Sequence, residues 1–238
     1  MTDEYFLRNR GTHAVVTGGG QGLGLAVAQR LAREGAPTIV LASRGVTKGE
    51  AAAKEVRALG AECIFVETDV AKPDDCFRLI DHAVATFGIV NGLVNAAANP
   101  DRGTLVDTGL DLWDAHFDTN ARGPCLLIQA TVRRLIDRGE PGSIVNVLSM
   151  AAHCGQSYLA PYSASKAALA NLTKNVANAY ARDRSLRRLR MRDGAGNSGP
   201  TMQSITENYF FFVDLGASPT FVVMPTPIAC KEARPSLA

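Results

Sequence analysis

Short apolar runs alternate with longer segments of helical periodicity over the first 182 residues of this 238-residue chain. The runs lie at residues 13–17, 38–42, 62–66, 91–95 and 143–148. The helical patterns cover residues 24–33, 48–59, 74–87, 112–137 (as one helix or two) and 162–181. Continuous apolar strands are buried on both faces of a sheet, and parallel strands need a crossover between them. The alternation therefore predicts a single α/β domain with a doubly wound parallel sheet.

The pattern changes after residue 181. Residues 182–192 hold six arginines and one aspartate, a local charge of +5 in a chain whose net charge is +2, so the remainder is mildly acidic. That balance offers no basic face to a nucleic acid, and we expect the arginine cluster to be a solvated run. No apolar run followed by a helical pattern continues the sheet. We therefore divide the chain into a domain of residues 1–182 and an atypical, partly irregular C-terminal segment of residues 183–238.

Composition favours a cytoplasmic protein. No stretch approaches the ~18 consecutive apolar residues of a membrane-spanning helix, and residues 1–10 are polar, unlike a secretory signal. The cysteines are odd in number and form no C-x-x-C pair: they are Cys63, Cys76, Cys125, Cys154 and Cys230. We expect buried thiols in a reducing compartment, with neither a disulfide framework nor a metal site.

A glycine-rich turn, TGGGQGLG at residues 17–24, separates the first apolar run from the first helical pattern. Glycines allow a tight turn and a close approach of the backbone to a ligand, and the free N–H groups at the start of a helix attract phosphate. An ordinary turn explains a lone glycine cluster equally well, but the place between strand and helix favours a pyrophosphate site. We predict that the binding residues are Gly18, Gln21, Gly22, Leu23 and Gly24.

The end of the second apolar run favours one dinucleotide over another. Sites for NAD(H) usually carry an acidic residue there, which binds the ribose 2′-hydroxyl. This chain has Ser43 and Arg44 instead, which suit a 2′-phosphate through a hydrogen bond and charge-assisted bonds. We therefore predict a preference for NADP(H) over NAD(H). The alternative is an ordinary exposed loop arginine.

Tyr162 and Lys166 form a Y-x-x-x-K pattern in the last predicted helix. A spacing of four places the two side chains on one face of a helix. An ammonium group beside a phenol favours the phenolate, so Tyr162 is a candidate general acid or base for a hydroxyl or carbonyl group. On its own, the pattern is equally typical of two surface residues.

With Asn120 and Ser149, these patterns resemble the short-chain dehydrogenase/reductase family in its compact single-domain form. The resemblance covers about residues 10–182 and consists of several motifs in the family's order: TGGGQGLG, Asp69-Val70, Asn95-Ala96-Ala97-Ala98, Asn120 in DTNARGP, Ser149 after the fifth apolar run, and YSASK at residues 162–166. It implies a Rossmann-like fold, a nicotinamide cofactor, and a homodimer or homotetramer built through the middle helices.

The resemblance also implies a role for each matched residue. Tyr162 would transfer the proton, while Lys166 would bind the nicotinamide ribose and assist Tyr162. Ser149 would hold the substrate oxygen, and Asn120 would support a water that relays the proton. The adenosine half of the cofactor would lie against Asp69, Val70, Asn95, Ala96 and Ala97.

Two departures from the family bear on function. The turn at residues 95–98 reads N-A-A-A where the family usually has N-N-A-G, and no sixth strand with a Pro-Gly turn follows the Tyr162 helix. We predict an oxidoreductase that uses NADP(H) to interconvert a small-molecule secondary alcohol and a carbonyl compound. The alternative is a vestigial nucleotide-binding protein, disabled by its divergent C-terminal region. The sequence leaves the substrate open, and His153 and Cys154 are candidates to line its pocket.

Overall fold

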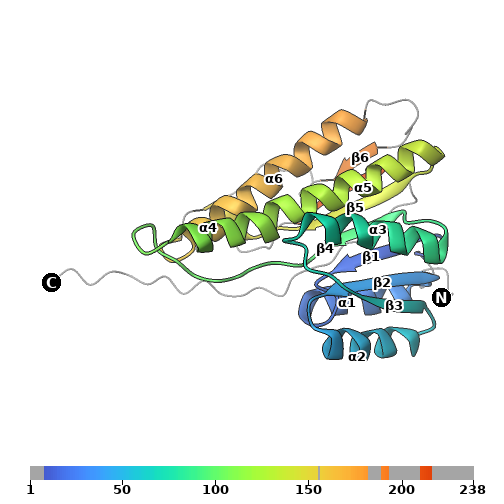
Figure 1. Cartoon of the computed structure of the whole chain (residues 1–238). Helices are drawn as coiled ribbons and strands as arrows, with labels where there is room; N and C mark the ends of the chain where they lie inside the picture. Colours follow the sequence, from blue (N-terminus) through green and yellow to red (C-terminus); the bar gives the residue numbers. More distant parts are fainter. Residues whose placement is uncertain (1–7, 155, 182–188, 193–209, 216–238) are drawn as a thin grey trace, which may run out of the picture.

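A sheet of five parallel strands forms the centre of the computed structural model, which confirms the predicted fold class (Figure 1). The structure describes residues 8–154, 156–181, 189–192 and 210–215. The parallel strands are β1 (His13–Thr17), β2 (Thr38–Ser43), β3 (Glu62–Glu67), β4 (Gly92–Asn95) and β5 (Gly142–Val147). They lie in the order β3-β2-β1-β4-β5, so the strand order reverses between β1 and β4. Ligands of such sheets bind at this reversal, outside the carboxyl ends of the strands.

Helices cover both faces of the sheet. One face carries α1 (Gly22–Arg33) and α2 (Val46–Arg57). The other carries α3 (Pro73–Phe87), α5 (Gly123–Arg138) and α6 (Ala160–Ala181), and Figure 1 shows α5 and α6 running in similar directions. The predicted helical region 112–137 consists of two helices, α4 (Leu110–Phe117) and α5, joined by a π-helical turn, η2 (Asp118–Arg122).

Alternate residues of the central strands supply two apolar cores. Val15 and Ile144 lie in the core under α3, α5 and α6, whereas Ala14 and Val16 lie in the core under α1 and α2. Each of these four side chains is at most 2 % exposed. Because both faces are buried, the strands read as continuous apolar runs in the sequence. The two cores hold the strand ends, and hence the loops that follow them, in fixed positions.

Two antiparallel strands extend the sheet beyond β5, in the region where the sequence pattern predicts no strand followed by a helix. β7 (Phe210–Leu215) pairs antiparallel with β5, and β6 (Leu189–Arg192) pairs antiparallel with β7. Residues 210–213 read FFFV, an aromatic and β-branched run with strong strand propensity. Pairing with β5 also covers an edge that would otherwise present unpaired backbone groups. Cys230 lies outside the described residues, as do all of residues 182–188, 193–209 and 216–238.

Within the described ranges, no helix combines the length and apolar character needed to cross a membrane. The same ranges contain no group of three side chains that could hold a metal ion. The four cysteines found there are free thiols. Burial raises the pKa of Cys63 to about 12 and that of Cys76 to about 11, so neither forms a reactive thiolate near neutral pH.

Candidate active site

The glycine turn after β1 is packed so closely that a Cβ at Gly18, Gly19, Gly20 or Gly24 would lie within 3.0 Å of a neighbouring atom. Gly18 has a φ of +67°, and a Cβ there would lie 2.8 Å from the backbone nitrogen of Ala97. At Gly24 a Cβ would overlap the carbonyl oxygen of Gly18. α1 begins at Gly22, its N-cap Gln21 makes no capping hydrogen bond, and its first turn holds no acidic residue. Free N–H groups at a positive helix end are what a pyrophosphate requires.

A hydroxyl that was not predicted joins this turn to the neighbouring strand. Thr17, the last residue of β1, is 1 % exposed. Its Oγ1 accepts hydrogen bonds from the backbone N–H groups of Ala96 at 3.1 Å and Ala97 at 3.2 Å. The turn after β4 is thereby held against the glycine turn, and this close approach of two backbones explains the need for glycine at position 18. The sequence feature that could have indicated this role of Thr17 is a threonine at the end of a strand, directly before glycines.

The structure places Ser43 against the glycine turn. Ser43 ends β2, and its Oγ lies 2.8 Å from where a Cβ of Gly20 would stand. Arg44 follows and is exposed. Lys48 brings a second positive charge to this corner, because its Nζ donates to Gln21 Oε1 at 3.0 Å. The corner thus holds the Ser43 hydroxyl and the Lys48 ammonium, with Arg44 next in the sequence.

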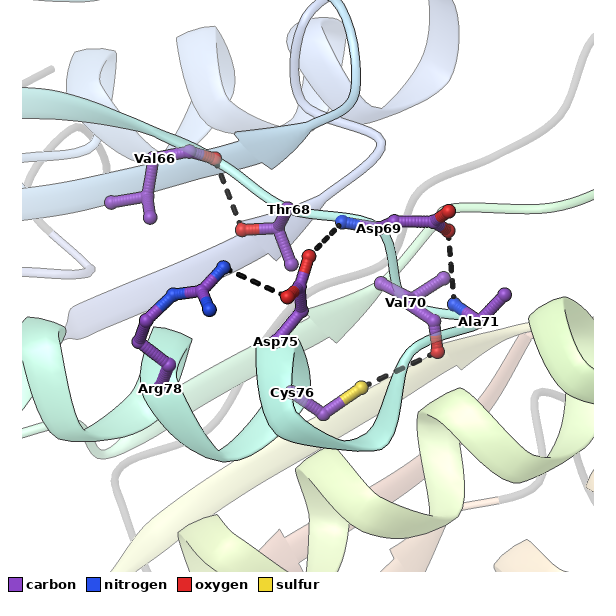
Figure 2. Close-up of polar contacts among 8 residues, drawn as sticks. All are labelled: Val66, Thr68, Asp69, Val70, Ala71, Asp75, Cys76 and Arg78. Atoms are coloured by element: carbon purple, nitrogen blue, oxygen red, sulfur yellow. Dashed lines mark hydrogen bonds and ion pairs between the residues drawn. The ribbon is translucent and has the colours of Figure 1, made fainter.

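The Asp69-Val70 pair lies in a loop that the start of α3 holds in place (Figure 2). Asp75 on α3 accepts the backbone N–H of Asp69 at 2.9 Å. The Asp69 carboxylate accepts the N–H of Ala71 at 3.1 Å, and the Val70 carbonyl accepts the Cys76 thiol at 3.3 Å. The hydrogen bond from Asp69 is the largest influence that keeps the pKa of Asp75 below its usual value. The loop backbone is therefore ordered by its own protein contacts.

Tyr162 and Lys166 lie one turn apart on α6. Lys166 is 2 % exposed, and its Nζ donates to the carbonyl oxygen of Val147, the last residue of β5, at 2.8 Å. The same nitrogen lies 6.0 Å from the centroid of the Tyr162 ring. Burial lowers the pKa of Lys166 from 10.5 to about 8. Because this value is above neutral pH, the group is mostly an ammonium at pH 7.

Ser149 follows β5 at the same edge of the sheet. It caps a short 3-10 turn, η3 (Met150–Ala152), where its Oγ accepts a backbone N–H from two residues later at 3.2 Å. The turn packs against α6, the helix that carries Tyr162. Because Oγ uses a lone pair for the backbone, the hydroxyl proton is available to another acceptor. His153 and Cys154 follow this turn and are exposed.

Asn120 lies in the π-helical turn η2 and is 0 % exposed. Its carboxamide binds the backbone of Asn99, in the loop after β4: Oδ1 accepts the Asn99 N–H at 2.8 Å, and Nδ2 donates to the Asn99 carbonyl at 3.1 Å. Nδ2 also donates to Ser165 Oγ at 3.0 Å, and that hydroxyl donates to the carbonyl of Tyr162 at 2.8 Å. Asn120 thus joins the loop after β4 to α6. The π-helical turn in which it lies is a kind of backbone irregularity that is frequent at functional sites.

The side chain of Asn95 belongs to a buried row of hydrogen bonds that crosses the sheet. Asn95 Nδ2 donates to Asn146 Oδ1 at 2.8 Å, and Asn146 Nδ2 donates to Thr173 Oγ1 at 2.9 Å. These three side chains are at most 1 % exposed. The row joins β4, β5 and α6, so it fixes the position of the helix that carries Tyr162. In the described part of the chain, Asn95 Oδ1 has no hydrogen-bond partner.

The predicted residues follow the carboxyl ends of the parallel strands. Printed contacts join the glycine turn to Ala96 and Ala97, and Asn120 to the helix that carries Tyr162. The sequence matches the family model for short chain dehydrogenases over residues 12–187. The chain belongs to the short-chain dehydrogenase family. The family resemblance drawn from the motifs is thus confirmed.

Two curated short-chain dehydrogenases illustrate the similarity. The chain is 39% identical over 165 residues to dehydrogenase/reductase SDR family member 4 of Oryctolagus cuniculus, a match that covers 69% of this chain and 63% of that protein. It is 35% identical over 161 residues to the short-chain dehydrogenase/reductase FrzI of a Cladobotryum species, covering 68% of this chain and 61% of that protein. The chain thus spans about three-fifths of the length of these relatives.

Solved structures of short-chain dehydrogenases share the fold. A putative short-chain alcohol dehydrogenase from Sinorhizobium meliloti 1021 superimposes with a TM-score of 0.71 at 28% identity, covering 74% of this chain and 69% of that one. A short chain dehydrogenase/reductase from Burkholderia phymatum, in complex with NAD, gives a TM-score of 0.69 at 31% identity, covering 72% and 61%. Both comparisons support the family assignment and the Rossmann-like architecture.

Several residues of this short-chain dehydrogenase site were not predicted. Ser165 lies inside the YSASK motif, and Asn146 is a lone amide in the fifth apolar run, which is a usable signal for a buried hydrogen bond. Asn99 acts through its backbone, which no side-chain pattern reveals. His116 is buried next to Asn120, and its sequence position gives no sign of that.

Proposed function

We propose that this protein is an NADP(H)-dependent oxidoreductase that interconverts a small-molecule secondary alcohol and a carbonyl compound by hydride transfer. The observation that carries the proposal is the set of Ser149, Tyr162 and Lys166 around the carboxyl end of β5. A protein that only binds a nucleotide needs the glycine turn, but it does not need this hydroxyl, phenol and ammonium. The NAD complex of the Burkholderia phymatum relative supports a nicotinamide dinucleotide as the cofactor class.

The residues present fit such a dinucleotide. Gly18 and Gly24 leave a backbone cradle in which side chains are excluded, directly before a helix N-terminus. Ser43 and Arg44, with Lys48 nearby, supply a hydroxyl and positive charge for a ribose 2′-phosphate. Neither residue at the end of β2 is an acid that would bind a free 2′-hydroxyl. These features support NADP(H) over NAD(H).

When bound, the nicotinamide ring would supply or accept the hydride. Tyr162 passes a proton to or from the substrate oxygen as the general acid or base. Ser149 donates its hydroxyl proton to the same oxygen, which orients the substrate and stabilises developing negative charge. The Lys166 ammonium, held at Val147 and 6.0 Å from the Tyr162 ring, stabilises negative charge on the phenol oxygen. Asn120 joins the backbone of Asn99 to α6 through its carboxamide, and it supports a water that relays the proton.

The acid–base assignment is tested with Tyr162→Phe, using Tyr180→Phe on the same helix as the matched control. The assay follows NADPH oxidation with a panel of ketones and aldehydes. We expect Tyr162→Phe to lower kcat about 1000-fold, within the range for general acid–base catalysis, and to leave the NADPH dissociation constant within about twofold. Tyr180→Phe keeps the wild-type rate. Turnover that persists in Tyr162→Phe would show that another group moves the proton.

The cofactor preference is tested with Arg44→Ala, using Arg33→Ala as a control because Arg33 is also exposed. A hydrogen bond to a charged group contributes about 1.5–3 kcal/mol, so we expect the NADPH dissociation constant to rise about tenfold or more. The NADH dissociation constant should change little, since NADH has no 2′-phosphate. An equal loss for both nucleotides would contradict the assigned contact.

A vestigial nucleotide-binding protein is the second candidate function. The family match ends at residue 187, and we propose that residues 183–238 form an atypical, partly irregular C-terminal segment of the chain, after the dinucleotide-binding and catalytic part of residues 1–182. In this case NADPH binds, but the wild-type chain reduces no carbonyl compound in the panel.

We further propose a cytoplasmic homodimer or homotetramer, as the family resemblance implies. A monomeric mass in sedimentation equilibrium would refute that assembly.

A further inference from the structure

The first turn of α3 reaches back to the loop after β3 with two side chains that have no role in the proposed mechanism (Figure 2). Asp75 accepts the backbone N–H of Asp69 at 2.9 Å. Cys76, which is 0 % exposed, donates its thiol hydrogen to the carbonyl of Val70 at 3.3 Å. Asp69 and Val70 are the residues that the family resemblance places against the adenosine half of the cofactor. α3 therefore holds the backbone of both residues.

The hydrogen bond from Asp69 to Asp75 is not an ordinary helix cap. The N-cap of α3 is Lys72, Pro73 is the first helical residue, and Asp75 is the third. In a capping box, the third residue reaches back to the N–H of the N-cap itself. Here the N–H of Lys72 already donates to the carbonyl of Asp69 at 2.9 Å, and Asp75 accepts from a residue that precedes the N-cap. The contact thus fixes the loop rather than the end of the helix.

Asp75 has one further partner, the guanidinium of Arg78. The Oδ1 atom of Asp75 accepts from Arg78 Nη2 at 2.8 Å, while Oδ2 accepts from Asp69. The Arg78 side chain is 61% exposed, and an ion pair with such an exposed partner contributes little to stability. Arg78 can also be replaced without removing the acceptor of the Asp69 N–H, so the two contacts are separable by experiment.

The loop on either side of Asp69 has contacts of its own. The N–H of Thr68 donates to the carbonyl of Ser43, the last residue of β2, at 3.0 Å. The N–H of Ala71 donates to Asp69 Oδ1 at 3.1 Å. Loss of the Asp75 carboxylate would therefore free the Asp69 N–H while the neighbouring N–H groups keep their acceptors. The expected change is local to the residues predicted to meet the adenine.

We propose that Asp75 is a positioning residue of the dinucleotide site, which holds Asp69 and Val70 in the conformation that receives the adenine. The inference rests on the proposed function, because it concerns the same cofactor. Without the acceptor, Asp69 and Val70 populate other backbone conformations, and only a fraction of the molecules is ready to bind. The apparent dissociation constant rises as that fraction falls. The groups around Tyr162 lie on other elements, so kcat at saturating NADPH stays the same.

Affinity is measured by calorimetric titration of the full chain with adenosine 2′,5′-bisphosphate, which carries the adenine and the 2′-phosphate but no nicotinamide. Asp75→Ala removes the acceptor, Asp75→Asn keeps an acceptor oxygen, and Arg78→Ala removes only the ion pair. We expect Asp75→Ala to raise the dissociation constant about tenfold, which is what one hydrogen bond is worth. Arg78→Ala should stay within about twofold of wild type, since exposed ion pairs are weak, and Asp75→Asn should match it.

Hydrogen exchange of the Asp69 amide tests the positioning without any enzymatic assay. In the wild-type chain, the Asp69 N–H should exchange slowly before any nucleotide is added, because it already has its acceptor. Asp75→Ala should exchange it about tenfold faster, whereas Asp75→Asn and Arg78→Ala keep the protection. A wild-type Asp69 amide that becomes protected only after the bisphosphate is added would overturn the inference, and that result needs no variant.

The kinetics of NADPH oxidation separate positioning from a general loss of structure. We expect Asp75→Ala to raise the KM for NADPH by the factor measured for the bisphosphate and to leave kcat within about twofold of wild type. A general loss of structure would lower kcat as well and would speed amide exchange throughout the central strands. An unchanged dissociation constant in Asp75→Ala, or an equal loss of affinity in Asp75→Ala and Arg78→Ala, would also overturn the inference.

The outcomes distinguish this inference from the proposed function. If the variants differ in bisphosphate binding as expected but the wild-type chain reduces no carbonyl compound, the proposed activity fails and the positioning role stands. If the wild-type chain binds neither NADPH nor the bisphosphate, both fail. Melting followed by circular dichroism identifies a variant that does not fold, and the exchange of the wild-type Asp69 amide then decides.

Discussion

Replacing Lys166 by methionine should stabilise the protein while it abolishes turnover. Burial lowers the pKa of Lys166 from 10.5 to about 8, and each pKa unit corresponds to about 1.4 kcal/mol. The ammonium therefore costs the folded state about 3 kcal/mol at neutral pH. Methionine fills a similar volume, but Val147 loses the donor to its carbonyl oxygen, at a cost of about 1 kcal/mol. The expected net gain for Lys166→Met at pH 7 is about 2 kcal/mol.

The stability difference between Lys166→Met and wild type depends on pH, because Lys166 loses its proton at a lower pH in the folded chain than in the unfolded chain. The folded pKa lies below the unfolded one, so between pH 8 and 10.5 the unfolded chain binds more protons than the folded chain. The free energy of unfolding of the wild-type chain therefore rises with pH across that window. Below the window, the folded state bears the full cost of burying the Lys166 ammonium. The advantage of Lys166→Met should shrink as the pH rises from 8 to 10.5.

Urea unfolding followed by circular dichroism at about pH 7 and about pH 10 measures the difference. Lys174→Met is the matched control, because Lys174 is exposed on the same helix. A Lys166→Met variant that is less stable than wild type at pH 7, or whose difference is the same at both pH values, would refute the reasoning. The buried ammonium would then be stabilised by contacts that outweigh its desolvation.

Two further substitutions test the cofactor side of the site. Gly24→Ala places a methyl group against the carbonyl of Gly18, so it should cost about 1–3 kcal/mol and abolish nucleotide binding in a calorimetric titration. Gly11→Ala, whose Cβ would meet nothing within 4 Å, is the near-neutral control, and an equal loss in both would argue against the close contact. Asp75 has a lowered pKa because it accepts the N–H of Asp69, so its stabilisation is present above its unfolded pKa of 3.8 and is lost as the pH falls through the folded value. Asp75→Asn should therefore lose less stability than wild type between about pH 5 and about pH 3, and an identical slope would contradict this.

The parallel part of the fold could be predicted because its signals are local. Each strand is a continuous apolar run, and each is followed by a helical pattern, which together specify a doubly wound sheet. The glycine turn is also a local signal, since close packing at Gly18 and Gly24 requires the residue type that stands there. Tyr162 and Lys166 could be paired from their spacing alone.

The remaining features depend on contacts between distant segments. The π turn at η2 has no breaking residue inside it, and it coincides with Asn120 binding the backbone of Asn99. The burial of His116 follows from the packing of α4 on α6 and leaves no mark on the local pattern. β7 pairs antiparallel with β5, which the apolar run at residues 210–213 alone does not specify, because a run indicates a strand but not its partner.

We propose above all that this chain forms a working nucleotide site that prefers NADP(H). Equilibrium unfolding of the 238-residue chain in the presence of NADPH, with NADH at the same concentration as the control, tests it most directly. A ligand at about 100 times its dissociation constant stabilises the native state by about 2.7 kcal/mol. We predict a stabilisation of that size by NADPH and a smaller one by NADH. A cooperative transition that neither nucleotide shifts would contradict the account.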